Sequence, residues 1–190
     1  MWKLVAGLGN PGPRYERTRH NLGFMALDVL AALFDVSLDR HKNEGWYAET
    51  TVGEERVMLV KPLTYMNRSG SCIAACCRNR ITDFSRVLII VDDVNLPLGR
   101  LRLRPGGSDG GHNGLKSVAE RLGTSGFPRL RLGVGRQTDE RELVAYVLSR
   151  FTLEEWPIAQ ALAKTGAEAA RCWLTDGILE AMNRYNGPNK

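Results

Sequence analysis

The chain has 190 residues, 43% hydrophobic and 25% charged, with a formal net charge of +5 and four cysteines. This size and composition are normal for a globular protein with one core, and they argue against a second domain. No apolar run reaches the roughly 18 residues of a membrane-spanning helix, and no signal peptide is expected before the first predicted strand. The cysteine and histidine spacings suit neither a disulfide framework nor a metal site, so we expect reduced thiols and a cytoplasmic location.

Strand-like and helix-like segments alternate along most of the chain. The segment over 87–91 is an uninterrupted apolar run, typical of a strand that is buried on both faces. Thr152 and Glu155 have the spacing of a capping box at a helix start. The predicted elements, in order, are a strand over 2–8, a helix after 21, strands over 46–52 and 56–60, a helix over 69–79, strands over 87–91 and 100–104, a helix over 115–122, a strand over 129–132, a helix from the capping box to about 172, and a last helix over 176–185.

Strands that alternate with helices favour a parallel sheet covered by helices, and the hairpin over 46–60 makes that sheet mixed. The predicted fold class is therefore α/β, a single domain with a mixed, mostly parallel twisted sheet flanked by helices on both faces. We expect this domain to cover residues 1–186 and a flexible C-terminal tail to cover residues 187–190.

Polar residues gather in the loops that follow the predicted strands, where α/β sheets bind their ligands. They are Asn10, His20, Asn67, Asp92, His112 and Asn113. A histidine, a carboxylate and several amides suit hydrolysis by an activated water, because the histidine can take the proton, the aspartate can hold its tautomer and the amides can bind an oxyanion. Taken singly, His20 also suits a capping or surface residue, and Asp92 a turn residue.

Two glycine motifs point elsewhere. Residues 7–12 match the glycine spacing of a dinucleotide-binding loop, but Pro11 and Pro13 prevent a helix from opening at once. Residues 106–110 match a serine nucleophile elbow, yet only His112 follows, which is too close for the order of an α/β-hydrolase triad. We therefore predict neither a dinucleotide cofactor nor a serine nucleophile.

Basic residues alternate with leucines in two predicted strands and suggest a nucleic-acid partner. Alternation places the arginines of each strand on one face, where they can contact phosphates or simply lie in solvent. The residues concerned are Arg100, Arg102, Arg104, Arg129 and Arg131, with Lys116 near the start of the helix after the glycine-rich loop.

Five stretches together resemble the bacterial peptidyl-tRNA hydrolase family, in that family's order and over nearly the whole chain. They are Gly7-Leu8-Gly9-Asn10-Pro11-Gly12, Thr18-Arg19-His20-Asn21-Leu22-Gly23, Lys61-Pro62-Leu63-Thr64-Tyr65-Met66-Asn67, Asp92-Asp93 followed by Leu96-Pro97-x-Gly99, and Gly110-Gly111-His112-Asn113-Gly114-Leu115-Lys116. The resemblance implies a cytoplasmic, cofactor-free, mostly monomeric hydrolase that cleaves the ester between a peptide and the terminal ribose of tRNA, and so recycles tRNA from aborted translation.

The resemblance also implies roles for single residues. His20 is expected to be the catalytic base, Asp92 to stabilise it, and Asn10 to select peptidyl esters over aminoacyl esters. The expected substrate-binding residues are Tyr15, Tyr65, Asn67, Asn113, Met66, His112 and Asn21. The resemblance implies Arg104 and Arg131 as contacts to the tRNA backbone. The pattern of basic residues in the predicted strand and helix adds Arg102 and Lys116 to these expected contacts.

Two other functions stay open from the residues alone. An RNA-binding module without chemistry would use the basic strands and leave the histidine, aspartate and asparagines unexplained. An esterase for small molecules would use those polar residues and leave the arginines unexplained.

Overall fold

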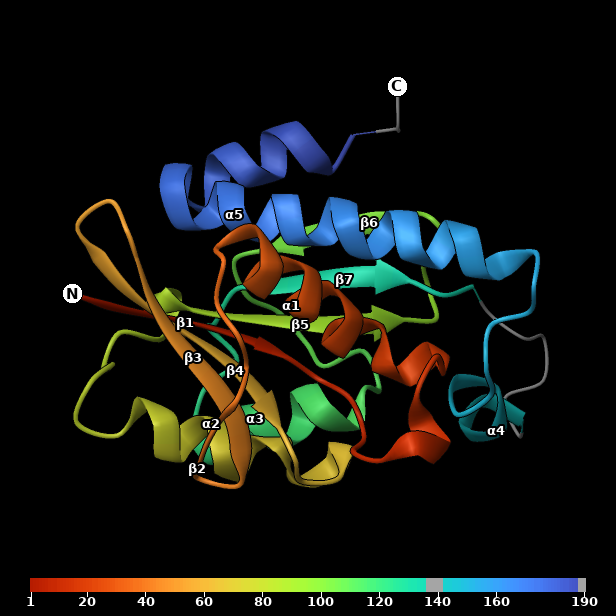
Figure 1. Cartoon of the computed structure of the whole chain (residues 1–190), viewed down its shortest axis with the longest axis horizontal. Helices are drawn as coiled ribbons and strands as arrows, with labels where there is room; N and C mark the ends of the chain where they lie inside the picture. Colours follow the sequence, from red (N-terminus) through yellow and green to blue (C-terminus); the bar gives the residue numbers. More distant parts are fainter. Residues whose placement is uncertain (136–141, 188–190) are drawn as a thin grey trace.

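The computed structural model describes residues 1–135 and 142–187, and within them it forms a seven-stranded sheet with the order β2-β3-β4-β1-β5-β7-β6 (Figure 1). Strands β4, β1, β5 and β7 are parallel neighbours, whereas the pairs β2–β3, β3–β4 and β6–β7 toward the edges are antiparallel. The strands are β1 (Trp2–Gly7), β2 (Arg40–Lys42), β3 (Gly45–Val52), β4 (Glu55–Pro62), β5 (Val87–Asp93), β6 (Leu101–Arg104) and β7 (Arg129–Gly133). The predicted mixed, mostly parallel sheet is confirmed.

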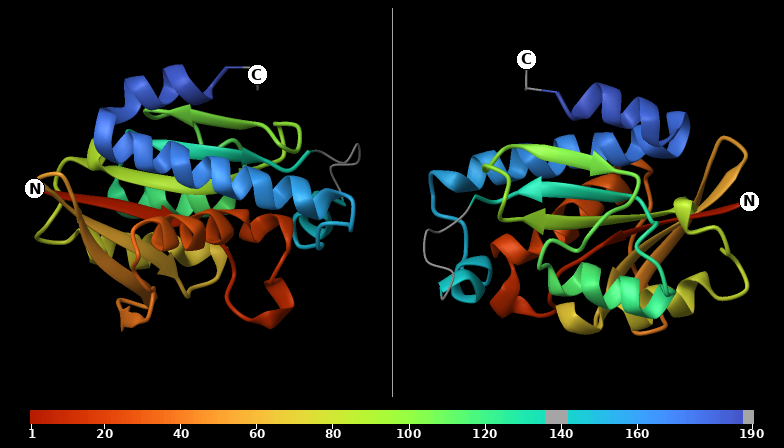
Figure 2. Two further views of the ribbon diagram at one scale, coloured as in Figure 1. Left: turned by 45° about the horizontal axis from the view of Figure 1, so that its top comes forward. Right: turned by 180° about the vertical axis from the view of Figure 1, so that it is seen from behind.

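Helices cover both faces of this sheet, as predicted (Figure 2). The α-helices are α1 (Leu22–Leu33), α2 (Ser69–Cys77), α3 (Asn113–Leu122), α4 (Leu143–Val147) and α5 (Glu155–Tyr185), and the 3₁₀ turns are η1 (Pro13–Tyr15), η2 (Arg19–Asn21), η3 (Met66–Arg68) and η4 (Phe84–Arg86). Helices α1 and α5 pack together on one face, and α2 and α3 on the other. Within the described residues, no helix is both long and apolar enough to cross a membrane.

Strand β5 shows why an unbroken apolar run belongs at the centre of the sheet. Leu88 and Ile90 point into the core under α1 and α5, while Val87, Ile89 and Val91 point into the core under α2 and α3. Because successive side chains of a strand leave on opposite faces, a strand with apolar layers on both sides has no position for a polar residue. The polar residues of β5 are Asp92 and Asp93, at its carboxyl end, where the strand reaches the edge of the core.

The structure differs from the prediction in several elements. The last two predicted helices form the single element α5, interrupted at Gly177, whose φ of 84° and ψ of 176° are readily adopted only by glycine. Strand β2 and helix α4 were not predicted, because β2 is short, polar and exposed and α4 has only five residues. Helix α3 starts at Asn113, two residues earlier than predicted.

Two local predictions concern the C-terminal part of the chain, and the structure allows a comparison for the first. The capping box is confirmed, since the Thr152 backbone N–H donates to Glu155 Oε2 at 2.8 Å and the Glu155 backbone N–H donates to Thr152 Oγ1 at 3.2 Å. Of the predicted tail, residues 188–190 lie outside the described part of the chain.

Candidate active site

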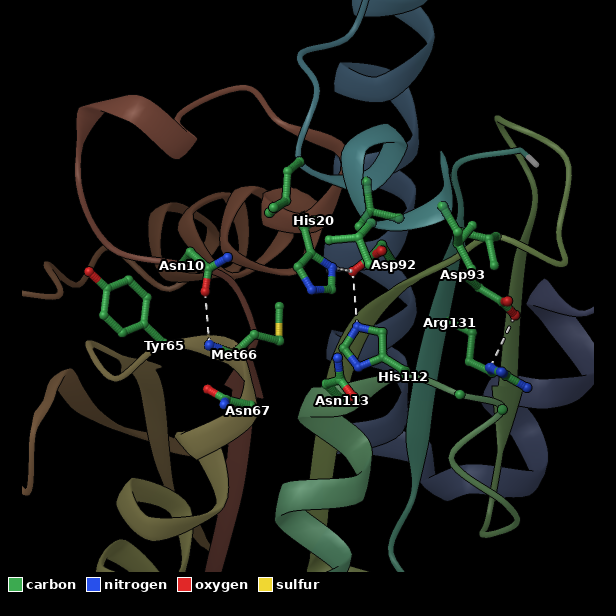
Figure 3. A pocket seen from close by; sticks show the side chains of 17 residues that line it. Asn10, His20, Tyr65, Met66, Asn67, Asp92, Asp93, His112, Asn113 and Arg131 are labelled. Atoms are coloured by element: carbon green, nitrogen blue, oxygen red, sulfur yellow. Dashed lines mark hydrogen bonds and ion pairs between the residues drawn. The ribbon is translucent and has the colours of Figure 1, made fainter. Parts of the chain in front are cut away.

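A pocket of about 350 Å³ opens at the carboxyl ends of β1, β4 and β5, where the parallel sheet presents its loops (Figure 3). Most of the predicted site residues line it, although they come from five separate parts of the chain. Those that line it are Asn10, His20, Tyr65, Met66, Asn67, Asp92, His112, Asn113 and Arg131.

The side chains of His20 and Asp92 meet, as the sequence predicted. His20 lies in η2, and its Nδ1 is 2.8 Å from Oδ1 of Asp92 at the end of β5. Burial of the imidazole lowers the pKa of His20, but the charge and the hydrogen bond of Asp92 outweigh it, so that this pKa is raised. Burial likewise opposes ionisation of Asp92, which is only 3% exposed, yet the two neighbouring histidines hold its pKa well below the usual range. The pair therefore favours an ionised carboxylate beside a nitrogen that can bind a proton.

His112 is the second partner of the same carboxylate oxygen, which the sequence did not predict. Its Nε2 lies 3.0 Å from Asp92 Oδ1, so that Asp92 stands between two imidazole rings (Figure 3). Its Nδ1 accepts hydrogen bonds from the backbone N–H groups of Gly114 at 3.1 Å and Leu115 at 3.3 Å. His112 thus caps the N-terminus of α3 with one ring nitrogen and contacts Asp92 with the other.

His20, Asp92 and His112 offer ligand atoms that all lie within 4.8 Å of one another, a set that can in principle hold a metal ion. A metal-bound histidine usually donates its other ring N–H to a carboxylate or carbonyl oxygen. Here the other ring nitrogen of His112 accepts two N–H groups instead, so the ring proton lies on Nε2, the atom that would have to bind the metal. The geometry favours a hydrogen-bonded cluster over a metal centre.

Asn10 is buried and held in one orientation by contacts on both sides. Its Oδ1 accepts from the Met66 backbone N–H at 2.8 Å. Its own backbone N–H and C=O are bridged by the side chain of Asn21, at 2.8 and 2.9 Å. Because Oδ1 is occupied, the Nδ2 group of Asn10 is directed to the His20 side of the pocket (Figure 3).

Two predicted substrate-binding residues lie outside the lining of this pocket. Asn21 is buried, and its side chain holds the backbone of Asn10. Tyr15 lies in η1, where its backbone carbonyl accepts from Thr18 Oγ1 at 2.7 Å. By contrast Tyr65 is at the mouth of the pocket and 60% exposed.

Helix α4 supplies an apolar wall that sequence reasoning missed. The residues that line the pocket are Leu143, Val144 and Val147 of the helix and Leu148, which follows it. The wall is tied down by Arg19, whose Nη1 donates to Ser149 Oγ at 2.7 Å and to the Arg150 carbonyl at 2.8 Å, and whose Nη2 pairs with Glu155. The short apolar run was visible in the sequence, but its relation to the pocket depends on these long-range contacts.

The basic residues of β6 and β7 share one face of the sheet but have different surroundings. Arg102 and Arg104 are exposed, and Lys116 is exposed on α3; none of the three lines the pocket. Arg131 lines it, with Nε 3.0 Å from Asp93 Oδ2. The expectation that Arg129 belongs to a phosphate-facing surface is wrong, because its side chain is 2% exposed and bonded to backbone carbonyls.

Comparison with known proteins places this geometry in a family. The family model described as peptidyl-tRNA hydrolase matches residues 4–190. The peptidyl-tRNA hydrolase of Symbiobacterium thermophilum is 48% identical over 98% of this chain and 100% of its own length, and that of Bacillus subtilis is 45% identical over 96% of this chain and 97% of its own. The crystal structure of the Acinetobacter baumannii peptidyl-tRNA hydrolase superposes with a TM-score of 0.91 at 30% identity, covering 97% of this chain and 94% of that one. The chain belongs to the peptidyl-tRNA hydrolase family.

Proposed function

We propose that this protein hydrolyses the ester that joins a peptide to tRNA in peptidyl-tRNA, with His20 as the general base that activates water. The observation that carries the proposal is the His20–Asp92 pair, at 2.8 Å, in a pocket lined by amide side chains in a member of this family. In this reaction the enzyme acts in the cytoplasm as a monomer, needs no cofactor, and returns free tRNA to translation.

The proton path follows from the tautomer of His20. Its Nδ1–H donates to Asp92, so Nε2 carries a lone pair on the side of the ring turned away from the carboxylate (Figure 3). A water molecule bound at Nε2 gives its proton to the ring as its oxygen attacks the ester carbonyl carbon. The imidazolium that forms is stabilised by Asp92 and returns the proton to the ribose oxygen as the C–O bond of the ester breaks.

The fixed amide of Asn10 supplies a basis for substrate selection. In a peptidyl ester the nitrogen next to the reacting carbonyl belongs to an amide whose oxygen can accept a hydrogen bond. In an aminoacyl ester the same nitrogen is an ammonium group, which has only donors to offer. Because Oδ1 of Asn10 is held by Met66, the group presented is the Nδ2 donor, which pairs with the first ester and not with the second.

The remaining surfaces divide between the two parts of the substrate. The apolar wall of α4 and Tyr65 suit the side chains of the peptide. Arg131, with the exposed Arg102, Arg104 and Lys116 beyond it, suits the phosphates of the tRNA. Asn67 and Asn113 lie between these regions, where they can hold the junction of peptide and ribose.

The proposal is tested by incubating peptidyl-tRNA and aminoacyl-tRNA with wild type, His20→Ala, Asn10→Ala and His41→Ala. His41 is an exposed histidine on β2, away from the pocket lining, and serves as the matched control. We expect His20→Ala to lose about 10²- to 10⁴-fold in kcat while still binding tRNA, and His41→Ala to match wild type. Asn10→Ala should lose discrimination between the two esters.

Turnover by His20→Ala within a few-fold of wild type would remove the general base from the proposal. Binding of tRNA without hydrolysis by the wild type would favour an RNA-binding module, and equal cleavage of small esters and peptidyl-tRNA would favour a general esterase.

A further inference from the structure

We propose that His112 is a positioning residue that fixes Asp92 and thereby sets the basicity of His20, acting as a neutral hydrogen-bond donor whose proton the start of α3 holds on Nε2. The inference rests on the proposed role of His20 as the base. It assigns His112 a task different from contact with the substrate.

The location of the ring proton follows from the cap. Backbone N–H groups can only donate, so the bonds from Gly114 and Leu115 require a lone pair at Nδ1 of His112. A neutral imidazole has a single N–H, which must then be at Nε2, where it faces Asp92 Oδ1 at 3.0 Å. The direction of this hydrogen bond is therefore decided by the helix start and not by Asp92 alone.

Asp92 Oδ1 consequently accepts from two rings, at 2.8 Å from His20 and 3.0 Å from His112. A carboxylate that is already bonded to one donor offers less of its negative charge to a second. His112 therefore limits how strongly Asp92 stabilises the imidazolium form of His20, while it turns the same oxygen toward both rings. Without it, the raised pKa of His20 would rise further and the free base would be scarcer at neutral pH.

Among the residues that the structure describes, the other charged groups around Asp92 leave the two histidines as its main partners. From β5 and β7, Asp93 and Arg131 lie at the pocket but pair with each other at 3.0 Å. From α3, Lys116 is exposed and does not line the pocket. The α4 residues that line the pocket are apolar.

Two substitutions separate the cap from the contact with Asp92. His112→Asn puts an oxygen at the N-cap position, which asparagine favours, but its shorter side chain ends where Nδ1 was. His112→Gln carries an amide N–H out to the position of Nε2 and gives up the favoured N-cap oxygen. The first variant keeps the cap and loses the donor to Asp92, and the second does the reverse.

The experiment measures kcat/KM against pH, urea unfolding, and the NMR titration of the His20 imidazole in the free enzyme. For His112→Asn we expect the unfolding midpoint to match that of wild type. We expect both the His20 titration and the acid limb of kcat/KM to move to higher pH by roughly half to one unit. On that limb the rate should therefore be lower by about 3- to 10-fold. For His112→Gln we expect a lower unfolding midpoint and an acid limb near that of wild type.

A His20 titration in His112→Asn that coincides with wild type would overturn the inference. So would a loss of rate in both variants that simply follows their loss of stability. His20→Ala is run in parallel, because an active His20→Ala means that the proposed function has failed, whereas an inert one beside an unshifted His112→Asn means that only the role of His112 has failed.

Discussion

Strands β6 and β7 have the same local pattern and opposite surroundings. Residues 101–104 read Leu-Arg-Leu-Arg and residues 129–132 read Arg-Leu-Arg-Leu, and the two strands pair so that Arg102 faces Arg131 and Arg104 faces Arg129. In both, the leucines are buried. The arginines of the edge strand β6 are exposed, whereas Arg129 is among the largest fully buried side chains described and Arg131 is paired with a carboxylate.

The surroundings of Arg129 explain the difference. The loop that leaves β6 folds over it, and its guanidinium donates to the carbonyls of Gly107 at 2.6 Å, Ser108 at 3.0 Å and Ser125 at 2.6 Å, with its Cζ 4.4 Å from the Phe127 ring centroid. Burial lowers the pKa of Arg129 to about 10, with a smaller effect from nearby Arg131, so it still carries its charge at neutral pH. In the sequence Arg129 suggests a nucleic-acid contact. In the structure it holds the glycine-rich loop before His112 through hydrogen bonds to the backbone of that loop.

Among substitutions of these arginines, the largest effect on stability is expected from Arg129→Lys. This change keeps the charge but replaces the planar guanidinium and its several N–H donors with one ammonium group. Several carbonyls then lose their donor, and we expect a loss of about 3 kcal/mol in the free energy of unfolding, measured by urea denaturation. A change below about 0.5 kcal/mol, the size of an ordinary surface substitution, would show that the carbonyl contacts contribute little.

A smaller effect is expected from Arg131→Gln, which leaves the buried carboxylate of Asp93 without its ion pair. We expect a loss of about 1–2 kcal/mol in stability, and a smaller loss when the same change is made in Asp93→Asn. A double-mutant cycle measures this coupling. Equal losses in the two backgrounds would mean that the pair does not act as a unit.

The double variant Arg102→Gln/Arg104→Gln should alter binding and not stability. Both side chains are exposed on an edge strand, so the unfolding free energy should change by less than about 0.5 kcal/mol. If these arginines contact phosphates, the slope of log affinity for tRNA against log salt should become shallower by about one to two. An unchanged slope would show that this face lies in solvent and away from the tRNA.

The smallest effect is expected from Arg104→Lys, the counterpart of Arg129→Lys on the facing strand position. An exposed lysine retains the charge seen by a phosphate, so stability and the salt slope should both stay within error of wild type. Urea denaturation and a tRNA titration check this result. A loss of stability comparable to that of Arg129→Lys would show that the exposed and the buried arginine contribute equally to stability.

Much of the site was predictable because its residues lie where strands end. The order of predicted strands and loops put His20, Asp92 and Asn10 at the ends of strands, where ligands bind. In the structure all three line one pocket. The positions of Tyr15 and Asn21 outside the lining were not predictable. Asn21 stands next to the lining residue His20 in the same motif, and Tyr15 lies in the loop between the lining residues Asn10 and His20. The α4 wall was missed because five apolar residues in a row do not reveal which distant loop they face.

By itself, the sequence determined every strand of the sheet except the short β2, the two faces of those strands and the polar residues beyond the strand ends. These depend on alternation over two residues, helical spacing and turn chemistry, all of which act between near neighbours. Only the tertiary structure decided that Arg129 is buried, that Arg19 anchors α4, and that His112 shares Asp92 with His20. Each of those outcomes depends on contacts between residues far apart in the chain, which no local pattern encodes.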